Sequence, residues 1–165
     1  MLAIEKIRKI TPENLPPLTI LTGDDLGQFE LFKDEFLKQI HYDPADLNVT
    51  LFDMKETSYA DVELDLVSLP FFADEKIIIL DHFADLTTAK KRYLSDEELK
   101  SFEQYLEAPS GTTKLVIFAE GKLDSKRRLV KILKRDGQIF EAAEIKETDL
   151  RQYFTKQAQL EGLDF

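Results

Sequence analysis

Two short segments that follow apolar runs are the first candidates for chemistry. The first is a turn in which Gly23 and Gly27 flank two aspartates and a leucine. A phosphate loop of the P-loop type needs glycines so that backbone amides face phosphate, then a lysine for the β and γ oxygens, and Ser or Thr for Mg²⁺. Gln28 and Phe29 stand where the lysine and the Ser or Thr are expected. The turn predicts a degenerate phosphate loop; the simpler interpretation is a strand-to-helix turn that uses Gly23 for its backbone freedom.

The second candidate is the end of the aliphatic run 77–80, which is followed by Asp81 and His82. Four aliphatic residues and an aspartate are typical of the strand that holds Mg²⁺ in P-loop ATPases. An active member would usually have a glutamate next, to polarise the attacking water, and His82 stands there instead. Two incomplete motifs in the expected order indicate an ATPase-like scaffold that has lost its chemistry. A nucleotide-dependent enzyme with a divergent phosphate loop remains the alternative.

No other catalytic or metal-binding arrangement is evident. The sequence has no cysteine, which excludes disulfides, thiolate metal sites and thiol nucleophiles, and its two histidines, His41 and His82, are far apart. Serines lack a nucleophile-elbow pattern. A further alternative is a receiver-like signalling domain that uses Asp24, Asp25 and Asp81. That fold has a lysine after its fifth strand, whereas the last expected strand here is followed by 141–143, Glu-Ala-Ala. We therefore expect no catalytic residue, no metal and no cofactor.

Charge favours a protein partner over nucleic acid. The net charge is -10, from 32 acidic and 22 basic residues, so a protein surface of this kind would repel a DNA backbone. Any DNA contact must be local or made through a partner. The helical segment Lys126 to Arg135 is strongly basic and could face DNA or an acidic subunit, although a solvated helix face is the simpler interpretation. Residues 1–9 alternate charged and aliphatic side chains, unlike a signal peptide, and we expect a cytoplasmic protein.

Short apolar runs alternate with amphipathic patterns, which predicts a three-layer α/β domain with a mainly parallel, five-stranded sheet. Ser58 and Ser95 are expected N-caps, and Gly137 is an expected C-cap. We expect residues 1–143 to form this domain and 144–165 to begin a second, helical lid-type domain that is truncated. The expected strands are 18–21, 48–54, 76–80, 114–119 and 138–140, and the expected helices are 29–40, 59–69, 95–107, 125–136 and 148–160.

The connection 68–75, Ser-Leu-Pro-Phe-Phe-Ala-Asp-Glu, is unusual because polar turn residues are expected between a helix and a buried strand. Pro70 breaks the helix, and Phe71 and Phe72 follow directly. The simpler interpretation is that both rings fold back into the core. The functional interpretation is that the two rings form an exposed apolar wedge that enters a pocket of a partner protein. Aromatic anchors of this kind dominate the binding energy at interfaces, with about 2 kcal/mol or more each.

Taken in order, these segments resemble the N-terminal region of the delta subunit of the bacterial DNA polymerase III clamp loader, in its Gram-positive form. The resemblance covers nearly the whole chain. No single motif is specific to this family. The resemblance rests on the whole set of segments in their order along the chain. Its segments are 18–25, 68–80, 114–118, 123–129 and 145–150.

The resemblance implies an AAA+-like fold without a functional P-loop and without intrinsic activity, in a subunit of a nucleotidyltransferase holoenzyme, the DNA-directed DNA polymerase. It implies that Leu69, Phe71 and Phe72 bind the beta sliding clamp and destabilise a clamp interface, so that the ring opens. Phe71 differs from the leucine of some relatives but stays apolar. The other implied partners are the gamma/tau and delta prime subunits in the full-length protein, with DNA bound only in the assembled complex and no membrane. Family members continue beyond residue 165 with further helical domains, so we expect this chain to be a fragment.

Overall fold

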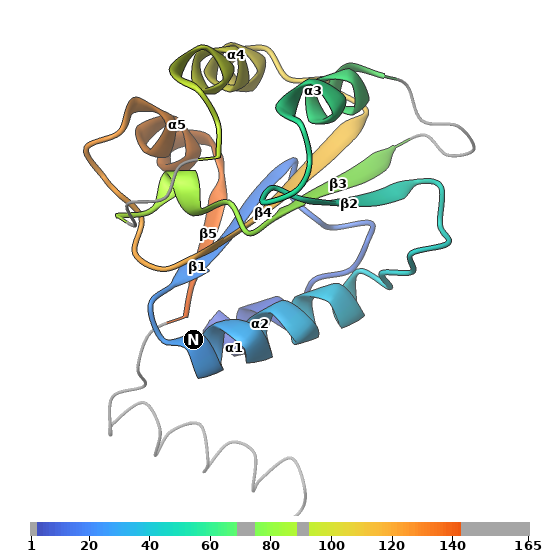
Figure 1. The fold of residues 1–165 in the computed structure, drawn as a ribbon. Helices are drawn as coiled ribbons and strands as arrows, with labels where there is room; N and C mark the ends of the chain where they lie inside the picture. Colours follow the sequence, from blue (N-terminus) through green and yellow to red (C-terminus); the bar gives the residue numbers. More distant parts are fainter. Residues whose placement is uncertain (1–2, 69–74, 89–92, 143–165) are drawn as a thin grey trace, which may run out of the picture.

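The computed structural model describes residues 3–68, 75–88 and 93–142 (Figure 1). In this part of the chain strands and helices alternate, as the sequence predicts. The expected helix 148–160 and the expected second domain lie outside the described residues. The elements are α1 (Ala3–Ile7), β1 (Leu18–Gly23), α2 (Leu26–Gln39), β2 (Val49–Asp53), α3 (Tyr59–Val67), β3 (Lys76–Asp81), a 3-10 turn η1 (Ala84–Leu86), α4 (Asp96–Glu107), β4 (Thr113–Glu120), α5 (Arg128–Asp136) and β5 (Gln138–Glu141).

The sheet is fully parallel, with five strands in the order β2-β3-β4-β1-β5. This confirms the predicted α/β class. It also excludes the receiver-like alternative, because that fold places β1 between β2 and β3, whereas β1 here pairs with β4 and β5. Within the described residues, no helix is both long enough and apolar enough to cross a membrane.

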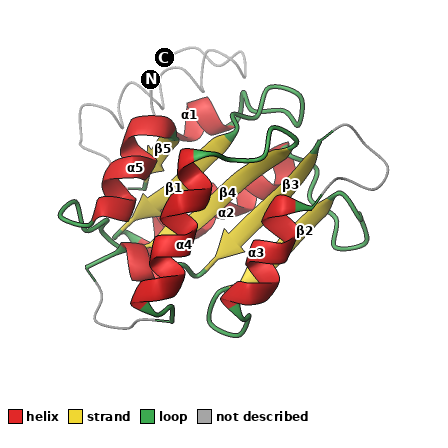
Figure 2. Ribbon diagram, turned by 90° about the horizontal axis from the view of Figure 1, so that it is seen from above, coloured by secondary structure: helices red, strands yellow, loops and turns green. Residues whose placement is uncertain are grey.

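Helices cover both faces of the sheet, so the fold has three layers (Figures 1 and 2). On one face α1 and α2 lie over a core that includes Phe29, Phe32, Phe36 and Phe118. On the other face α3, α4 and α5 enclose a second core. The runs in β3 and β4 are buried along almost their whole length, as β-branched runs covered on both faces require.

The predicted N-caps are present. Ser58 accepts a hydrogen bond from the Ala60 amide, and Ser95 forms a capping box with Glu98. Three helix boundaries differ from prediction by two residues or more. Helix α2 begins at Leu26, three residues early. Helix α3 ends at Val67, two residues early, and α5 begins three residues late because 124–127 form a turn around the Asp124 carbonyl and carboxylate.

Gly137 follows α5 as predicted, but for a different physical reason. A C-cap glycine normally adopts a left-handed conformation. Here its φ is -103°, which any residue can adopt. A Cβ at this position would instead lie 2.5 Å from Ile20 Cδ1 and 2.8 Å from the Leu133 carbonyl oxygen. Close packing of α5 on β1, rather than backbone freedom, therefore requires glycine.

We predict that Gly137→Ala lowers the free energy of unfolding by about 1–3 kcal/mol, since the new methyl group overpacks the α5–β1 contact. Urea denaturation measures this loss. Gly111→Ala is the matched control, because a Cβ there meets nothing within 4 Å. Gly137→Asn separates the two explanations. Asparagine is tolerated in a left-handed cap but is larger than alanine, so it should destabilise more than alanine does; a milder effect would contradict the packing explanation.

Candidate functional site

The carboxyl edge of the sheet is the expected position for a ligand. In open α/β sheets, ligands bind outside the carboxyl ends of the strands, where adjacent strands lead to opposite faces. Here β1 leads to α2 on one face and its neighbour β4 leads to α5 on the other (Figure 1). The crevice between β1 and β4 is therefore where a nucleotide would bind.

Backbone hydrogen bonds close this crevice. The Gly23 amide donates to the Gly121 carbonyl at 2.9 Å, and the Gly121 amide donates back to the Gly23 carbonyl at 2.6 Å. The Thr22 hydroxyl also donates to the Gly121 carbonyl, at 2.9 Å. Gly23 has a φ of 138°, and a Cβ there would overlap the carbonyl oxygen of Ala142. The Gly23 amide is thus bonded within the chain rather than open to a phosphate.

The start of α2 is capped by its own carboxylate. Asp25 accepts a hydrogen bond from the Gln28 amide at 3.1 Å through its side chain, and from the Phe29 amide at 2.8 Å through its carbonyl. The N-terminus of a helix is a ready anion site, and here a carboxylate already fills it. Gly27 lies in the first turn of α2, and Phe29 is buried in the core rather than facing the edge. Of the four predicted loop residues, Gly23 therefore ends β1, and Gly27, Gln28 and Phe29 lie in the first turn of α2.

Asp81 is paired within the chain as well. Its Oδ2 lies 2.7 Å from Lys33 Nζ, and its Oδ1 accepts a hydrogen bond from the His82 amide at 2.9 Å. Both side chains of the ion pair are largely buried, at 15% exposure for Lys33 and 8% for Asp81. Lys33 Nζ also lies 5.7 Å from the centroid of the Phe118 ring, within reach of a cation–π contact. The carboxylate expected at the Mg²⁺ position is therefore neutralised by a lysine from α2.

No prediction from the sequence involved Lys33, although its spacing carried a signal. It lies four residues after Phe29 and three before Phe36, which places it on the apolar face of α2. A charged residue on a core-facing stripe needs a buried partner. The aspartate at the end of the buried strand β3 is that partner.

His82 adopts a left-handed backbone conformation, with φ of 57°, and its Nδ1 lies 3.0 Å from Asp53 Oδ1 at the end of β2. Desolvation acts to raise the pKa of the Asp53 carboxyl. Hydrogen bonds from the Lys55 amide and the His82 ring, together with the positive charge of both side chains, outweigh it and lower that pKa on balance. His82 thus ties β3 to β2 where a catalytic glutamate would stand.

The amino edge of the sheet carries two buried lysines that the sequence analysis did not single out. Lys76 begins β3, and its Nζ lies 2.6 Å from Ser68 Oγ and 3.2 Å from Asp65 Oδ1, and also contacts the Asp65 carbonyl. Its side chain is only 7% exposed. These contacts join the end of α3 to the start of β3. They fix both ends of the connection that contains the predicted wedge. Leu69, Phe71 and Phe72 themselves lie outside the described residues.

Lys114 plays a similar part at the start of β4. Its Nζ donates to the carbonyls of Pro12 and Glu13, at 3.0 and 3.4 Å, and lies 3.8 Å from Glu75 Oε1. The sequence signal is shared by both residues: each lysine directly precedes a continuous aliphatic run. A lysine at that position satisfies loop carbonyls where the strand enters the core.

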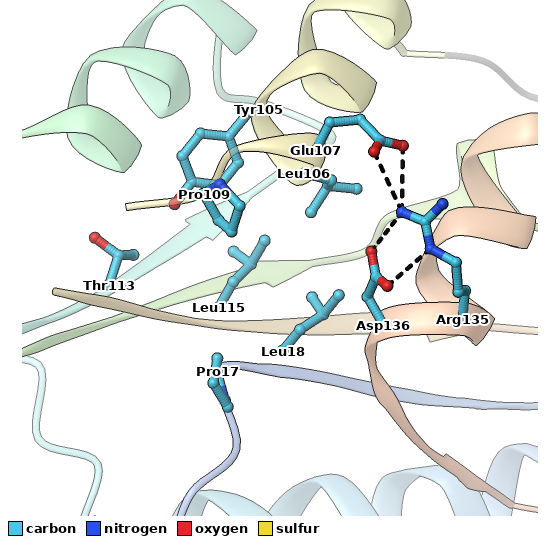
Figure 3. A pocket seen from close by; sticks show the side chains of 10 residues that line it. All are labelled: Pro17, Leu18, Tyr105, Leu106, Glu107, Pro109, Thr113, Leu115, Arg135 and Asp136. Carbon is cyan, nitrogen blue, oxygen red and sulfur yellow. Dashed lines mark hydrogen bonds and ion pairs between the residues drawn. The ribbon is translucent and has the colours of Figure 1, made fainter. Parts of the chain in front are cut away.

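A pocket of about 460 Å³ also lies at the amino edge, between the ends of α4 and α5 (Figure 3). Leu18, Leu106 and Leu115 contribute apolar lining. At one end Arg135 lies between two carboxylates, with Nη2 3.3 Å from both Glu107 oxygens and 2.8 Å from Asp136 Oδ2. The pocket lies at the edge opposite the β1–β4 crevice, so it does not correspond to the predicted phosphate loop.

Comparisons with known proteins agree with this architecture. The curated DNA polymerase III subunit delta of Bacillus subtilis (strain 168) is 25% identical over 123 residues, covering 74% of this chain and 35% of that protein. The solved Bacillus subtilis DNA clamp loader delta protein superposes with a TM-score of 0.75 at 23% identity, over 96% of this chain and 47% of that chain. A DNA polymerase III gamma subunit-related protein from Thermotoga maritima superposes with a TM-score of 0.51 at 15% identity, over 93% of this chain and 49% of that chain.

The structural matches confirm the predicted AAA+-like three-layer fold. The chain spans about a third of the curated relative (35%) and about half of the solved clamp loader chain (47%). The family model for the DNA polymerase III delta subunit matches residues 20–143, from within β1 to just beyond β5. Because that match covers well over half of the sequence, the chain belongs to the DNA polymerase III delta subunit family.

Proposed function

We propose that this chain is the clamp-binding arm of a bacterial clamp loader, which binds the beta sliding clamp and opens it for loading onto primed DNA. Family membership over residues 20–143 is the observation that carries the proposal. The arm itself hydrolyses no ATP. In the full-length protein it works with the gamma/tau and delta prime subunits in the cytoplasm, and DNA is bound only within the assembled complex.

The state of the carboxyl edge supports an arm without nucleotide chemistry. A bound triphosphate would need free backbone amides at the β1–α2 turn, but those of Gly23 and Gln28 are engaged by Gly121 and Asp25. It would also need a carboxylate free for Mg²⁺, whereas both oxygens of Asp81 are engaged. Every one of these contacts would have to break before a nucleotide could bind.

The amino edge supports the position of the clamp contact. We assign the wedge to Leu69, Phe71 and Phe72, between α3 and β3. Lys76 fixes both ends of this connection through Asp65 and Ser68. A fixed base lowers the conformational entropy that an apolar anchor loses on binding. The wedge would therefore be presented at the edge of the sheet opposite the closed nucleotide crevice.

We predict that Phe71→Ala combined with Phe72→Ala, in the full-length delta subunit, weakens binding to the cognate sliding clamp by at least about 30-fold, because two aromatic anchors are lost. Surface plasmon resonance with immobilised clamp measures the dissociation constant. The matched control is Leu26→Ala, which removes an exposed leucine (58%) at the start of α2, at the opposite edge. Unchanged affinity in the double variant would refute the wedge assignment, and a parent protein that does not bind the clamp would refute the proposed function.

We predict that calorimetric titration with Mg-ATP gives no binding heat up to about millimolar nucleotide, a concentration that corresponds to only about -4 kcal/mol of binding free energy. The closed β1–β4 crevice is the physical reason. Micromolar binding would favour the alternative of a nucleotide-dependent enzyme with a divergent phosphate loop.

We predict that the ion pair of Lys33 and Asp81 stabilises the fold in place of a bound ligand. Lys33→Met should lower the free energy of unfolding by about 2 kcal/mol, since it leaves a buried carboxylate without its charged donor. A double-mutant cycle with Asp81→Asn isolates the pairwise term, because the two substitutions should be less destructive together than their sum. Additive losses in urea denaturation would show that the pair is not coupled.

A further inference from the structure

We infer that the outer face of α3, through Leu64 and Val67, is part of the surface that docks on the sliding clamp. The inference rests on the proposed function and extends it to side chains that the sequence analysis did not consider. Both residues lie on the last two turns of α3, and Val67 is the final residue of that helix. They therefore adjoin the connection in which the wedge is assigned.

The two side chains expose far more apolar surface than their place in a helix requires. Leu64 is 70% exposed and Val67 is 61% exposed, whereas Val62 and Leu66 on the inner face are fully buried. Helix α3 is amphipathic and already contributes its inner face to the core, so its outer face is expected to be polar. A spacing of three residues places Leu64 and Val67 side by side on that outer face.

Paired exposure of this kind is found at one place in the described part of the chain. The other large apolar side chains exposed there are Leu26, Leu31 and Leu47. Leu26 and Leu31 are five residues apart on α2 and point to different sides of it, while Leu47 lies in the loop before β2. Single exposed leucines are ordinary, whereas adjoining ones mark a contact surface.

The fold holds this face in place. Helix α3 is the end helix of its layer, over the β2 side of the sheet, with α4 on one flank (Figure 2). Its inner face packs on α4 through Tyr59 and Phe102, whose ring centroids are 6.2 Å apart. At its C-terminal end, Lys76 binds the carbonyl and carboxylate of Asp65, and Thr113 donates to the Leu66 carbonyl at 3.4 Å. The apolar pair is thus presented by a helix secured at both ends.

The surrounding charges define the chemistry of the partner. Helix α3 carries Asp61, Glu63 and Asp65 and no basic residue. Asp61 and Glu63 are exposed, and Glu75 is exposed where the chain enters β3. An apolar pair bordered by carboxylates fits an apolar pocket with a cationic rim. We assign that pocket to the face of the clamp that also receives the wedge.

The test compares variants of the full-length delta subunit for binding to immobilised cognate clamp. Leu64→Ala with Val67→Ala removes apolar area without weakening the helix, because alanine has the highest helix propensity. We expect the dissociation constant to rise about tenfold, mostly through faster dissociation, as for truncation of contact residues that dominate an interface. Leu31→Ala is the matched control, since this residue is 52% exposed on α2, at the opposite face of the sheet.

A second variant tests the charged border. Asp61→Asn with Glu63→Gln should slow association, and its deficit relative to the parent should shrink as salt is added, because exposed charges act mainly on the encounter rate. Thermal unfolding curves that match the parent show that both variants are folded. An association rate equal to that of the parent at low salt would contradict the cationic rim.

The outcomes separate this inference from the proposed function. Loss of binding on replacing Phe71 and Phe72, with unchanged binding after Leu64→Ala and Val67→Ala, overturns the inference and leaves the function standing. Weaker binding from the α3 variant alone supports the inference and refutes the wedge assignment. If the parent does not bind the clamp at all, both fail.

Discussion

Parallel pairing of all five strands is the constraint on which the rest of the structure depends, because it gives the sheet two unlike edges. Every turn that follows a strand lies at the carboxyl edge, and every turn that precedes one lies at the amino edge. The two are about 20 Å apart for strands of six residues. The two edges therefore present separate surfaces. In this chain the carboxyl edge is closed by internal contacts, while exposed apolar surface adjoins the amino edge through Val67 at the end of α3.

The carboxyl edge shows how an ATPase-like scaffold can be stable without nucleotide. The amides of Gly23 and Gln28 and both oxygens of Asp81 have partners within the chain. Asp25 supplies the negative charge at the start of α2 and Lys33 supplies the positive charge beside Asp81. These two side chains supply the charges that a bound phosphate and Mg²⁺ would otherwise supply, so the buried charges at this edge are paired. This pairing also makes nucleotide binding a displacement reaction, in which existing hydrogen bonds must be given up before new ones form.

The fold was predictable because strands buried on both faces have continuous aliphatic runs, such as Ile77-Ile78-Ile79. The starts of α3 and α4 were predictable because a serine N-cap bonds to an amide only two or three residues away. The site was less predictable. The positions of Lys33 and Lys76 indicate burial, but the sequence does not show that Asp81 and Asp65 are their partners. Gly137 was correctly predicted to follow α5, but glycine is required there by close packing against Ile20, which is a tertiary contact. The short helix α1 was not predicted. The wedge residues Leu69, Phe71 and Phe72 stay a prediction.

The buried lysines at the amino edge connect these observations. A lysine that begins a buried strand loses hydration, so it is stable there only if carbonyls or carboxylates surround its ammonium group. Lys76 meets that condition through contacts with the end of α3, and Lys114 through contacts with the loop before β1 and with Glu75. Satisfying the two charges therefore fixes the segments on either side of the connection 68–75. Because the ordering has already occurred in folding, it is not required again when a partner binds. The same contacts that make two buried charges tolerable also make this edge a suitable base for a protein interface.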